Sequence, residues 1–152
     1  MSGIFLTVWD QQLKHDSLLL ESTKGGYPHI TLAYTGKHVA ANELALLASQ
    51  ALQHSVQSTV TITKAYRNTF IEQRTGAERH DVLLAIAETK AISEWRQSVL
   101  GQHPKVSQFA MRAPHITYKT YYTQQQAERC VDAINGLLHA PYQVTITGVT
   151  ID

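Results

Sequence analysis

Apolar residues alternate with polar or aromatic residues in six stretches of the chain, and this period of two is typical of strands with one buried face. We expect strands at residues 4–10, 29–34, 60–71, 82–87, 115–122 and 142–151. The third and fourth are expected to form a long hairpin across the polar segment 72–81, which contains Gly76. Gly148 is expected to mark a bulge in the last strand.

Apolar positions recur at helical spacing in three other stretches. The first predicted helix covers residues 42–54 with Asn42 as its N-cap, and a short second one covers residues 92–99. The third begins after Thr123, which forms a capping box with Gln126. Its apolar stripe consists of Ala127, Cys130, Val131, Ile134 and Leu138. The order of elements indicates an α+β fold in a single domain spanning residues 1–152.

The composition excludes several classes of protein. Lys and Arg number 13 and Asp and Glu 12, so the net charge of +1 does not favour a polybasic membrane anchor or a nucleic-acid coat. The single cysteine, Cys130, cannot form an internal disulfide and indicates a reducing compartment. The first ten residues resemble neither a signal peptide nor a membrane span. We therefore expect a soluble cytoplasmic protein, monomeric by default and without a membrane partner.

The tetrapeptide Pro-His-Ile-Thr occurs twice, at residues 28–31 and at residues 114–117. Each copy opens a predicted strand that is followed, after a loop, by an amphipathic helix. A lone His or Thr on a strand is usually a satisfied or solvated side chain, but two copies in the same context favour a shared function.

Successive side chains of a strand lie on opposite faces, so each copy divides into two sets. The residues expected to face the helices are Ile30, Leu32, Tyr34, Ile116 and Tyr118. The residues expected on the opposite, polar face are His29, Thr31, His115, Thr117 and Lys119. The histidines expected at surface or loop positions are His15, His38, His54, His80, His103 and His139.

Two imidazoles close together can share one proton near neutral pH, because free histidine has a pKa of about 6.5. One is then a base and the other an acid, as in-line displacement at a phosphodiester requires. The hydroxyls of Thr31 and Thr117 can donate hydrogen bonds to the non-bridging phosphate oxygens. The scheme needs no metal, and the sequence has neither a zinc-ligand pattern nor a serine-nucleophile motif.

These paired His-x-Thr motifs resemble the 2H phosphoesterase superfamily. The superfamily includes LigT-type RNA phosphodiesterases, 2',3'-cyclic phosphodiesterases, viral 2',5'-phosphodiesterases and phage anti-CBASS phosphodiesterases. The resemblance implies a two-lobed fold in which pseudo-twofold antiparallel β-sheets line a cleft, with helices outside. It implies the catalytic set His29, Thr31, His115 and Thr117 and no cofactor. Many relatives continue the motif as H-x-T-L-x-R, whereas this chain reads HITLAY and HITYKT.

Four further residues are candidates for substrate binding. Lys119 follows the second motif, where it is either a cation for a phosphate or a solvated strand-end lysine. Phe5, Trp9 and Tyr121 are candidates for stacking on a base, with ordinary packing as the alternative. The near-neutral charge favours a small nucleotide or short oligonucleotide over long nucleic acid.

The leading hypothesis is a metal-independent phosphodiesterase that hydrolyses small 2'-5'- or 3'-5'-linked oligonucleotides. Cyclic oligonucleotide immune signals belong to this class, and a viral or phage origin would then place the protein in the host cytoplasm. One alternative is a 2',3'-cyclic phosphodiesterase acting on RNA ends or small cyclic nucleotides. An alternative of another class is a module that binds nucleotides or RNA without reaction.

Overall fold

In the computed structural model of the chain, five long segments are described: residues 2–9, 29–35, 59–87, 113–138 and 142–151. Shorter described pieces are residues 40, 42–43, 45–47, 49–50, 90, 92–95, 97 and 106–107. The strands are β1 (Ser2–Trp9), β2 (His29–Thr35), β3 (Thr59–Ile71), β4 (Glu78–Ile86), β5 (Val106–Ser107), β6 (His115–Tyr121) and β7 (Tyr142–Ile151). The helix α5 spans Gln124–Leu137.

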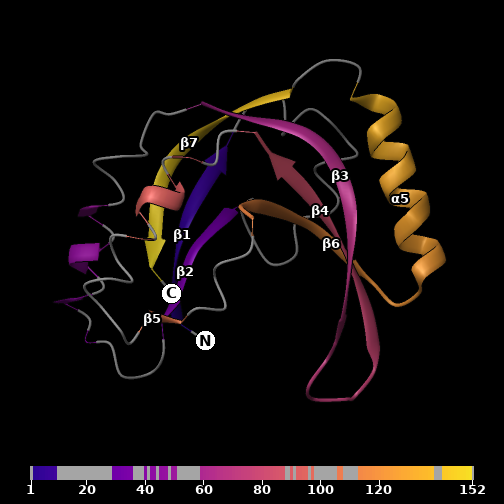
Figure 1. The fold of residues 1–152 in the computed structure, drawn as a ribbon, viewed down its shortest axis with the longest axis horizontal. Coiled ribbons are helices and arrows are strands. Elements are labelled where there is room, and N and C mark those ends of the chain that lie inside the picture. The colour runs from indigo at the N-terminus through magenta and orange to yellow at the C-terminus, as the bar shows by residue number, and fades with distance from the viewer. Residues whose placement is uncertain are drawn as a thin grey trace.

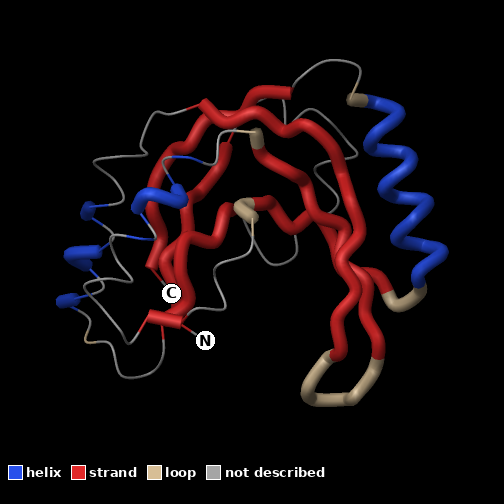
Figure 2. Tube along the Cα trace, viewed as in Figure 1, coloured by secondary structure: helices blue, strands red, loops and turns tan. Residues whose placement is uncertain are grey.

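The strands of these segments form one sheet in the order β1-β7-β3-β4-β6-β2-β5, with antiparallel pairing throughout. Strand β1 pairs with β2 as well as with β7, so the pairing runs around a closed ring that only β5 stands outside. Figure 1 shows the sheet curled into an arch, with α5 on its outer side beside β3. The tube in Figure 2 shows the same layering, with the helices outside the strands.

The sheet has two halves. The first consists of β1, β2 and β7, and the second consists of β3, β4 and β6. The halves meet where β3 pairs with β7 and where β2 pairs with β6. The expected two-lobed antiparallel α+β fold is therefore confirmed, with the two expected sheets joined into one. One copy of the His-x-Thr motif lies in each half, on β2 and on β6.

One apolar cluster lies between the sheet and the helices. It contains Ile30 and Ile116 from the two motif strands, together with Leu47, Ile92 and Trp95 from the described helical residues. Because the side chains of Ile30 and Ile116 are 0% and 2% exposed, both motif strands turn their isoleucines toward the helices, as predicted. Tyr118 is buried as predicted, whereas the side chains of Leu32 and Tyr34 lie outside the described ones.

Helix α5 begins and packs as the sequence indicates. The hydroxyl of Thr123 accepts a hydrogen bond from the backbone N–H of Gln126 at 3.2 Å, which satisfies one donor of the first turn. Farther along, the side-chain amide of Asn135 exchanges two hydrogen bonds with the backbone of Ala65 on β3, at 2.8 and 3.1 Å. These bonds attach the helix to the second half of the sheet.

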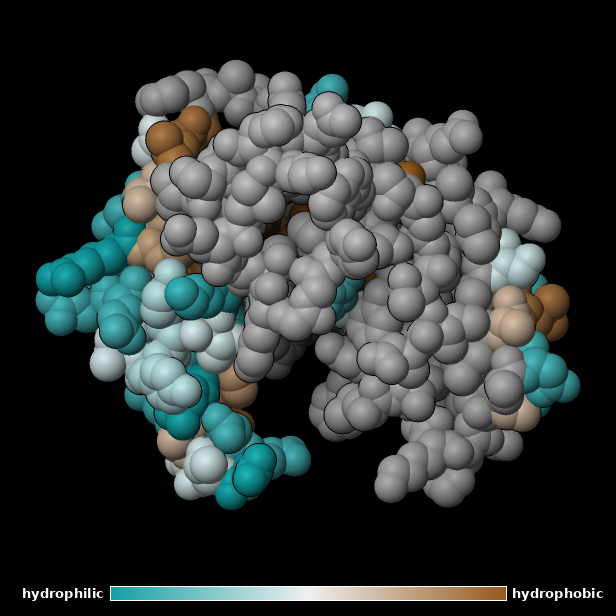
Figure 3. Space-filling model, turned by 180° about the vertical axis from the view of Figure 1, so that it is seen from behind, coloured by the Kyte–Doolittle hydropathy of each residue, from teal (hydrophilic) through white to brown (hydrophobic). Residues whose placement is uncertain are grey.

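The β3–β4 hairpin is longer than expected, because β4 begins at Glu78 rather than near Val82. The turn is closed by backbone hydrogen bonds from Gly76 to Glu72 at 2.7 Å and from Glu72 to Ala77 at 2.9 Å. Gly76 has a φ of 69°, in the left-handed region that glycine adopts most readily. The hairpin carries hydrophilic side chains at its free end, as Figure 3 shows from behind. The alternation of apolar and polar residues alone therefore underestimates the length of such a strand.

The remaining predicted elements agree with the described residues. Described residues between 42 and 50 and between 90 and 97 are helical, and the rest of both predicted helices lies outside the described residues. The register of β1 and β7 shifts where Thr7 pairs with Gly148, as expected for a bulge. Strand β5 was not expected. Among the helices that the structure describes, none is long and apolar enough to cross a membrane.

Histidine 80 corrects one expectation, since it is buried in β4 and not at the surface. Its Nδ1 lies 3.3 Å from Arg67 Nη1 and 3.1 Å from the Thr69 hydroxyl, and its Nε2 lies 3.8 Å from a carboxylate oxygen of Glu78. A guanidinium can only donate, so Nδ1 is the acceptor in the contact with Arg67. These polar neighbours offset the energetic cost of burying an imidazole. The other five histidines of that group lie outside the described residues.

Candidate functional site

The two copies of the motif lie side by side in the sheet. Ile30 of β2 and Ile116 of β6 are paired residues in an antiparallel ladder. Ile30–Ile116 is the one pair that the described residues form in this ladder. Because antiparallel strands run in opposite directions, His29 and Thr117 flank it on one side and Thr31 and His115 on the other. The arrangement has local twofold symmetry about the Ile30–Ile116 pair.

The polar residues of both motifs face away from the core. Ile30 and Ile116 point into the apolar cluster, and alternation then turns their neighbours to the other face of the sheet. His29, Thr31, His115 and Thr117 are all half-buried there. Residues directly opposite in such a pair have Cβ atoms about 5 Å apart, and diagonal neighbours are about 7–8 Å apart. The two histidines lie on a diagonal, one on each side of the Ile30–Ile116 pair.

One ring nitrogen of His115 is committed to the backbone. Nδ1 lies 2.8 Å from the carbonyl oxygen of Ala113. A carbonyl oxygen only accepts, so Nδ1 carries a proton and Nε2 is the nitrogen that gains or loses one. Pro114 restricts Ala113 to an extended conformation, which helps to hold this carbonyl in place. The orientation of the His115 ring is therefore fixed by the segment that directly precedes β6.

Neighbouring strands surround the motif with defined residues. Ala85 and Leu83 of β4 pair with His115 and Thr117, respectively. Leu83 is buried on this face, outside the main apolar cluster, and forms an apolar neighbour of the motif. Lys64 of β3 pairs in turn with Ala85, which places an exposed lysine in the same row as His115, two strands away. The sequence did not single out Lys64, because its row depends on strand order.

The expected positions of Lys119 and Tyr121 are wrong, because β6 does not alternate regularly. The ladder with β4 shifts, so that Thr117 pairs with Leu83 while Lys119 pairs with the adjacent Val82. Leu83 and Val82 point to opposite faces, and therefore so do Thr117 and Lys119. An extra residue in β6 thus turns Lys119 and Tyr121 toward the face that α5 covers.

Contacts of the two side chains agree with this assignment. The Tyr121 ring packs against the core cluster beside α5, and the Lys119 ammonium lies 5.3 Å from the centre of that ring. Burial, followed by the hydrogen bond with the Cys130 thiol of α5, raises the pKa of the Tyr121 hydroxyl. Cys130 is itself half-buried against the core, as predicted. Tyr121 therefore has a packing role in this structure.

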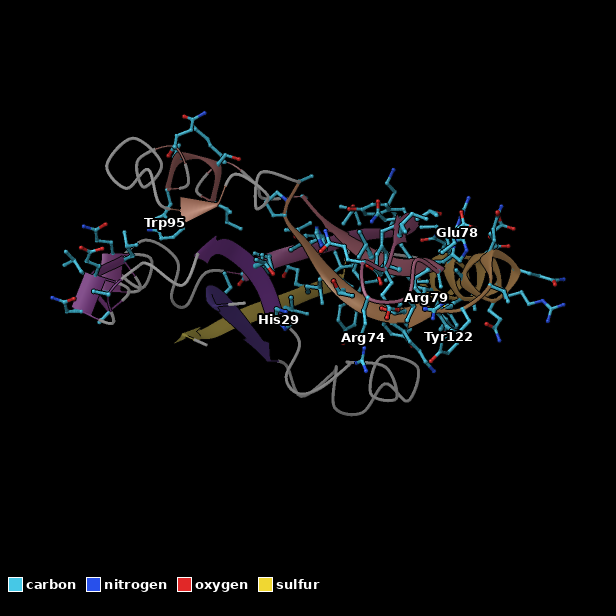
Figure 4. The ribbon with its side chains drawn as sticks, turned by 90° about the horizontal axis from the view of Figure 1, so that it is seen from below. His29, Arg74, Glu78, Arg79, Trp95 and Tyr122 are labelled. Atoms are coloured by element: carbon cyan, nitrogen blue, oxygen red, sulfur yellow. The ribbon has the colours of Figure 1, made fainter. Side chains whose placement is uncertain are left out.

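Tyr122, one residue later, lies on the motif's face of the sheet. The Cζ atom of the Arg79 guanidinium lies over its ring, 4.5 Å from the ring centre. Arg79, Asp81 and Leu83 alternate along β4 on one face, and Leu83 is the partner of Thr117. Figure 4, viewed from below, shows Arg79 with Tyr122 on the second half of the sheet and His29 on the first. Tyr122 could have been found only by foreseeing the bulge in β6. No glycine or other turn residue marks that bulge in the sequence.

The two aromatic candidates of β1 are placed only by their backbones. Phe5 pairs with Thr31 in the ladder between β1 and β2, and Trp9 pairs with Thr145 in the ladder between β1 and β7. The side chains of both lie outside the described ones. Their expected stacking stays a prediction.

Comparisons with known proteins add a likeness of fold. Usb1 from Kluyveromyces marxianus is similar over 99% of this chain and 96% of that chain, at 12% identity and a TM-score of 0.49. Its structure with uridine monophosphate is similar over the same shares, at 12% identity and a TM-score of 0.50. At this identity the likeness concerns the fold alone. Neither a family model nor a curated protein matches the chain.

Proposed function

We propose that this protein is a metal-independent phosphodiesterase in which His29 and His115 act as general acid and general base. The observation that supports this most strongly is the pairing of Ile30 with Ile116. It sets two identical His-x-Thr units on neighbouring strands and on one face, related by a local twofold axis. This is the symmetry of a reaction that needs a base on one side of a phosphorus atom and an acid on the other.

The proposed reaction is an in-line displacement. A neutral imidazole takes the proton from the attacking hydroxyl or water as its oxygen forms a bond to phosphorus. The bond to the leaving oxygen breaks, and that oxygen takes a proton from the second, cationic imidazole. One proton has then moved from one histidine to the other, and exchange with solvent restores the starting state. His115 acts through Nε2, because its Nδ1 proton is held by the Ala113 carbonyl.

The threonines are proposed to hold the phosphate. Thr31 and Thr117 lie on the same face as the histidines, two residues along each strand, so their hydroxyls can donate to the two non-bridging oxygens. Negative charge on those oxygens grows during displacement, and fixed donors aimed at developing charge stabilise the transition state. Lys64, in the row of His115, adds a cation on the same face.

The proposed substrates are small 2'-5'- or 3'-5'-linked oligonucleotides, with cyclic oligonucleotide signals among them. The net charge of +1 supports a ligand with few phosphates. A fold-related structure, that of Usb1, contains uridine monophosphate, which supports a ligand of nucleotide size. A cytoplasmic location and a role against nucleotide-based immune signalling belong to the same proposal.

Hydrolysis of a nucleotide panel in EDTA tests the proposal. The panel contains linear 2'-5' and 3'-5' oligoadenylates, cyclic di- and trinucleotides, and RNA ending in a 2',3'-cyclic phosphate. We expect at least one class to be hydrolysed without added metal, with the products identified by mass spectrometry. Consumption of the 2',3'-cyclic phosphate alone would favour the alternative enzyme over the leading one.

Substitution of the two histidines completes the test. His29→Ala and His115→Ala should each lower kcat by about 10²- to 10⁴-fold while substrate still binds. His103→Ala, a histidine outside both motifs, serves as the matched control and should keep full activity. An absence of hydrolysis, or hydrolysis that needs a divalent metal, would contradict the proposal. Tight binding by the wild type without any turnover would favour a binding module.

A further inference from the structure

An exposed aromatic ring is held in place at one end of the motif's face. Tyr122 is 73% exposed, yet its ring lies against the guanidinium of Arg79 at 4.5 Å. Arg79 is itself fixed, since its Nε lies 3.1 Å from a carboxylate oxygen of Glu72 and its Nη1 donates to the Glu78 carbonyl at 3.2 Å. The cation therefore orders the ring while leaving most of it open to solvent.

Tyr122 and the proposed catalytic residues share a continuous strip of the sheet. Along β4, the strip runs from Leu83, the partner of Thr117, through Asp81 to Arg79. The carboxylate of Asp81 is held toward β6 on this strip, because its Oδ1 accepts a hydrogen bond from the Thr120 hydroxyl at 2.5 Å. Figure 4 shows Arg79, Tyr122 and the hairpin residue Arg74 on one side of the hairpin and Glu78 on the other.

The length of the strip sets the size of a ligand that could use both ends. Arg79 lies four residue steps along β4 from Leu83, which is about 13 Å at strand spacing. At roughly 3.4 Å per stacked nucleotide along one strand, this span corresponds to up to about four steps from one nucleotide to the next. A mononucleotide at the motif cannot reach Tyr122.

We propose that Tyr122, ordered by Arg79, is a base-stacking subsite for a short linear single-stranded oligonucleotide whose scissile phosphate lies at the paired motifs. This inference rests on the proposed function and narrows its substrate class to linear chains of three or more nucleotides. Stacking on an aromatic face is tolerant of sequence, because every base has such a face. Glu72 offsets the charge of Arg79, so the contribution of the subsite depends on stacking and changes little with salt.

Chain-length dependence of hydrolysis tests the subsite. The value of kcat/KM is measured for oligoadenylates of two to six residues in the 2'-5' and 3'-5' series, with wild type, Tyr122→Ala and Tyr122→Phe. In the wild type we expect kcat/KM to rise about tenfold or more from the dimer to the longer chains. Tyr122→Ala should abolish the rise and leave the dimer value unchanged, whereas Tyr122→Phe should retain it.

Leu137→Ala, at an exposed apolar residue on α5, is the matched control and should retain the rise. Length-independent hydrolysis by the wild type would overturn the subsite while leaving the proposed function intact. An equal loss by Tyr122→Ala at every length would also overturn it.

If no length is hydrolysed, the proposed function fails, and binding of fluorescein-labelled pentaadenylate then decides the subsite on its own. About tenfold weaker binding by Tyr122→Ala, but not by Tyr122→Phe, would support it. Equal binding by all three proteins would overturn it.

Discussion

Ile30 and Ile116 are paired across β2 and β6, and both are buried in the main apolar cluster. The same two residues that carry the local twofold axis of the site therefore also contribute to the core. Each strand is fixed by burial on one face and presents its His and Thr on the other. Burial of these two isoleucines in the core therefore also fixes the strands that carry the proposed catalytic residues.

Ile116→Ala should lower the free energy of unfolding by about 2–5 kcal/mol, because it removes buried methyl groups and leaves a cavity. Urea unfolding followed by circular dichroism measures this change. Ile71→Ala is the matched control, since Ile71 is 61% exposed, and should change stability by less than about 0.5 kcal/mol. Equal effects of the two substitutions would contradict the burial described for Ile116.

Thr31→Val and Thr117→Val should each lower kcat by about a hundredfold, because each removes a donor aimed at charge that develops in the transition state. KM should change little, since valine keeps the shape of threonine and its preference for strands. Steady-state kinetics on the best substrate of the panel provide the measurement. Thr59→Val, at an exposed position of β3, is the control and should behave as wild type. A full rate in both motif variants would remove the threonines from the proposed mechanism.

The dependence of kcat/KM on pH should be bell-shaped, with both limbs between about pH 5 and 8. One imidazole must be neutral and the other cationic, so activity falls when both are protonated and when both are deprotonated. Rates measured across this range in buffers of constant ionic strength check the shape. A flat profile would mean that the two histidines do not exchange a proton with the substrate.

Lys64→Met and Lys119→Met should have different effects, because the two lysines lie on opposite faces of the sheet. Lys64→Met is expected to raise KM severalfold, more at low salt than at high salt, since an exposed cation attracts phosphate through a screened interaction. Lys119→Met should leave KM unchanged. The KM values of both variants at two salt concentrations provide the comparison. The reverse pattern would contradict the register of β6.

Tyr121→Phe should make stability less sensitive to alkaline pH. The pKa of Tyr121 in the folded chain is raised above its ordinary value of 10.0, first by burial and then by the bond to Cys130. Above pH 10 the unfolded chain loses this proton while the folded chain keeps it, so the stability contribution is present below pH 10 and falls as pH rises. Urea unfolding at pH 9 and pH 11 should show a larger loss for wild type than for the variant. Equal losses would mean that Tyr121 is not buried as described.

Much of the fold was predictable from periodicity. The strands of β1, β2, β6 and β7 and the helix α5 leave clear patterns, because each has one buried face and well-defined ends. The start of β4 was missed because residues 78–81 are polar on both faces, and their order comes from pairing with β3. Strand β5, with its two residues, is too short for any period to reveal.

The candidate site was predictable only in part. The repeated tetrapeptide identified the two motifs, but their adjacency follows from sheet order, which pairs strands that are distant in sequence. The irregularity in β6 exchanged the faces of Lys119 and Tyr121 with those of Thr120 and Tyr122, and no residue type announces it. Lys64 was missed because its position beside the motif also depends on the order of the strands in the sheet. Its row is a property of three neighbouring strands and not of its own segment.

Each half of the sheet supplies one histidine, so the proposed acid–base pair exists only when both halves are present. The motif strands also lie far apart along the chain, and closing so large a loop is among the slow steps of folding. Under the proposed mechanism, a nascent chain therefore gains its pair of histidines only once β6 has been synthesised and has paired with β2. Completion of the sheet is then also the step that assembles the proposed catalytic set.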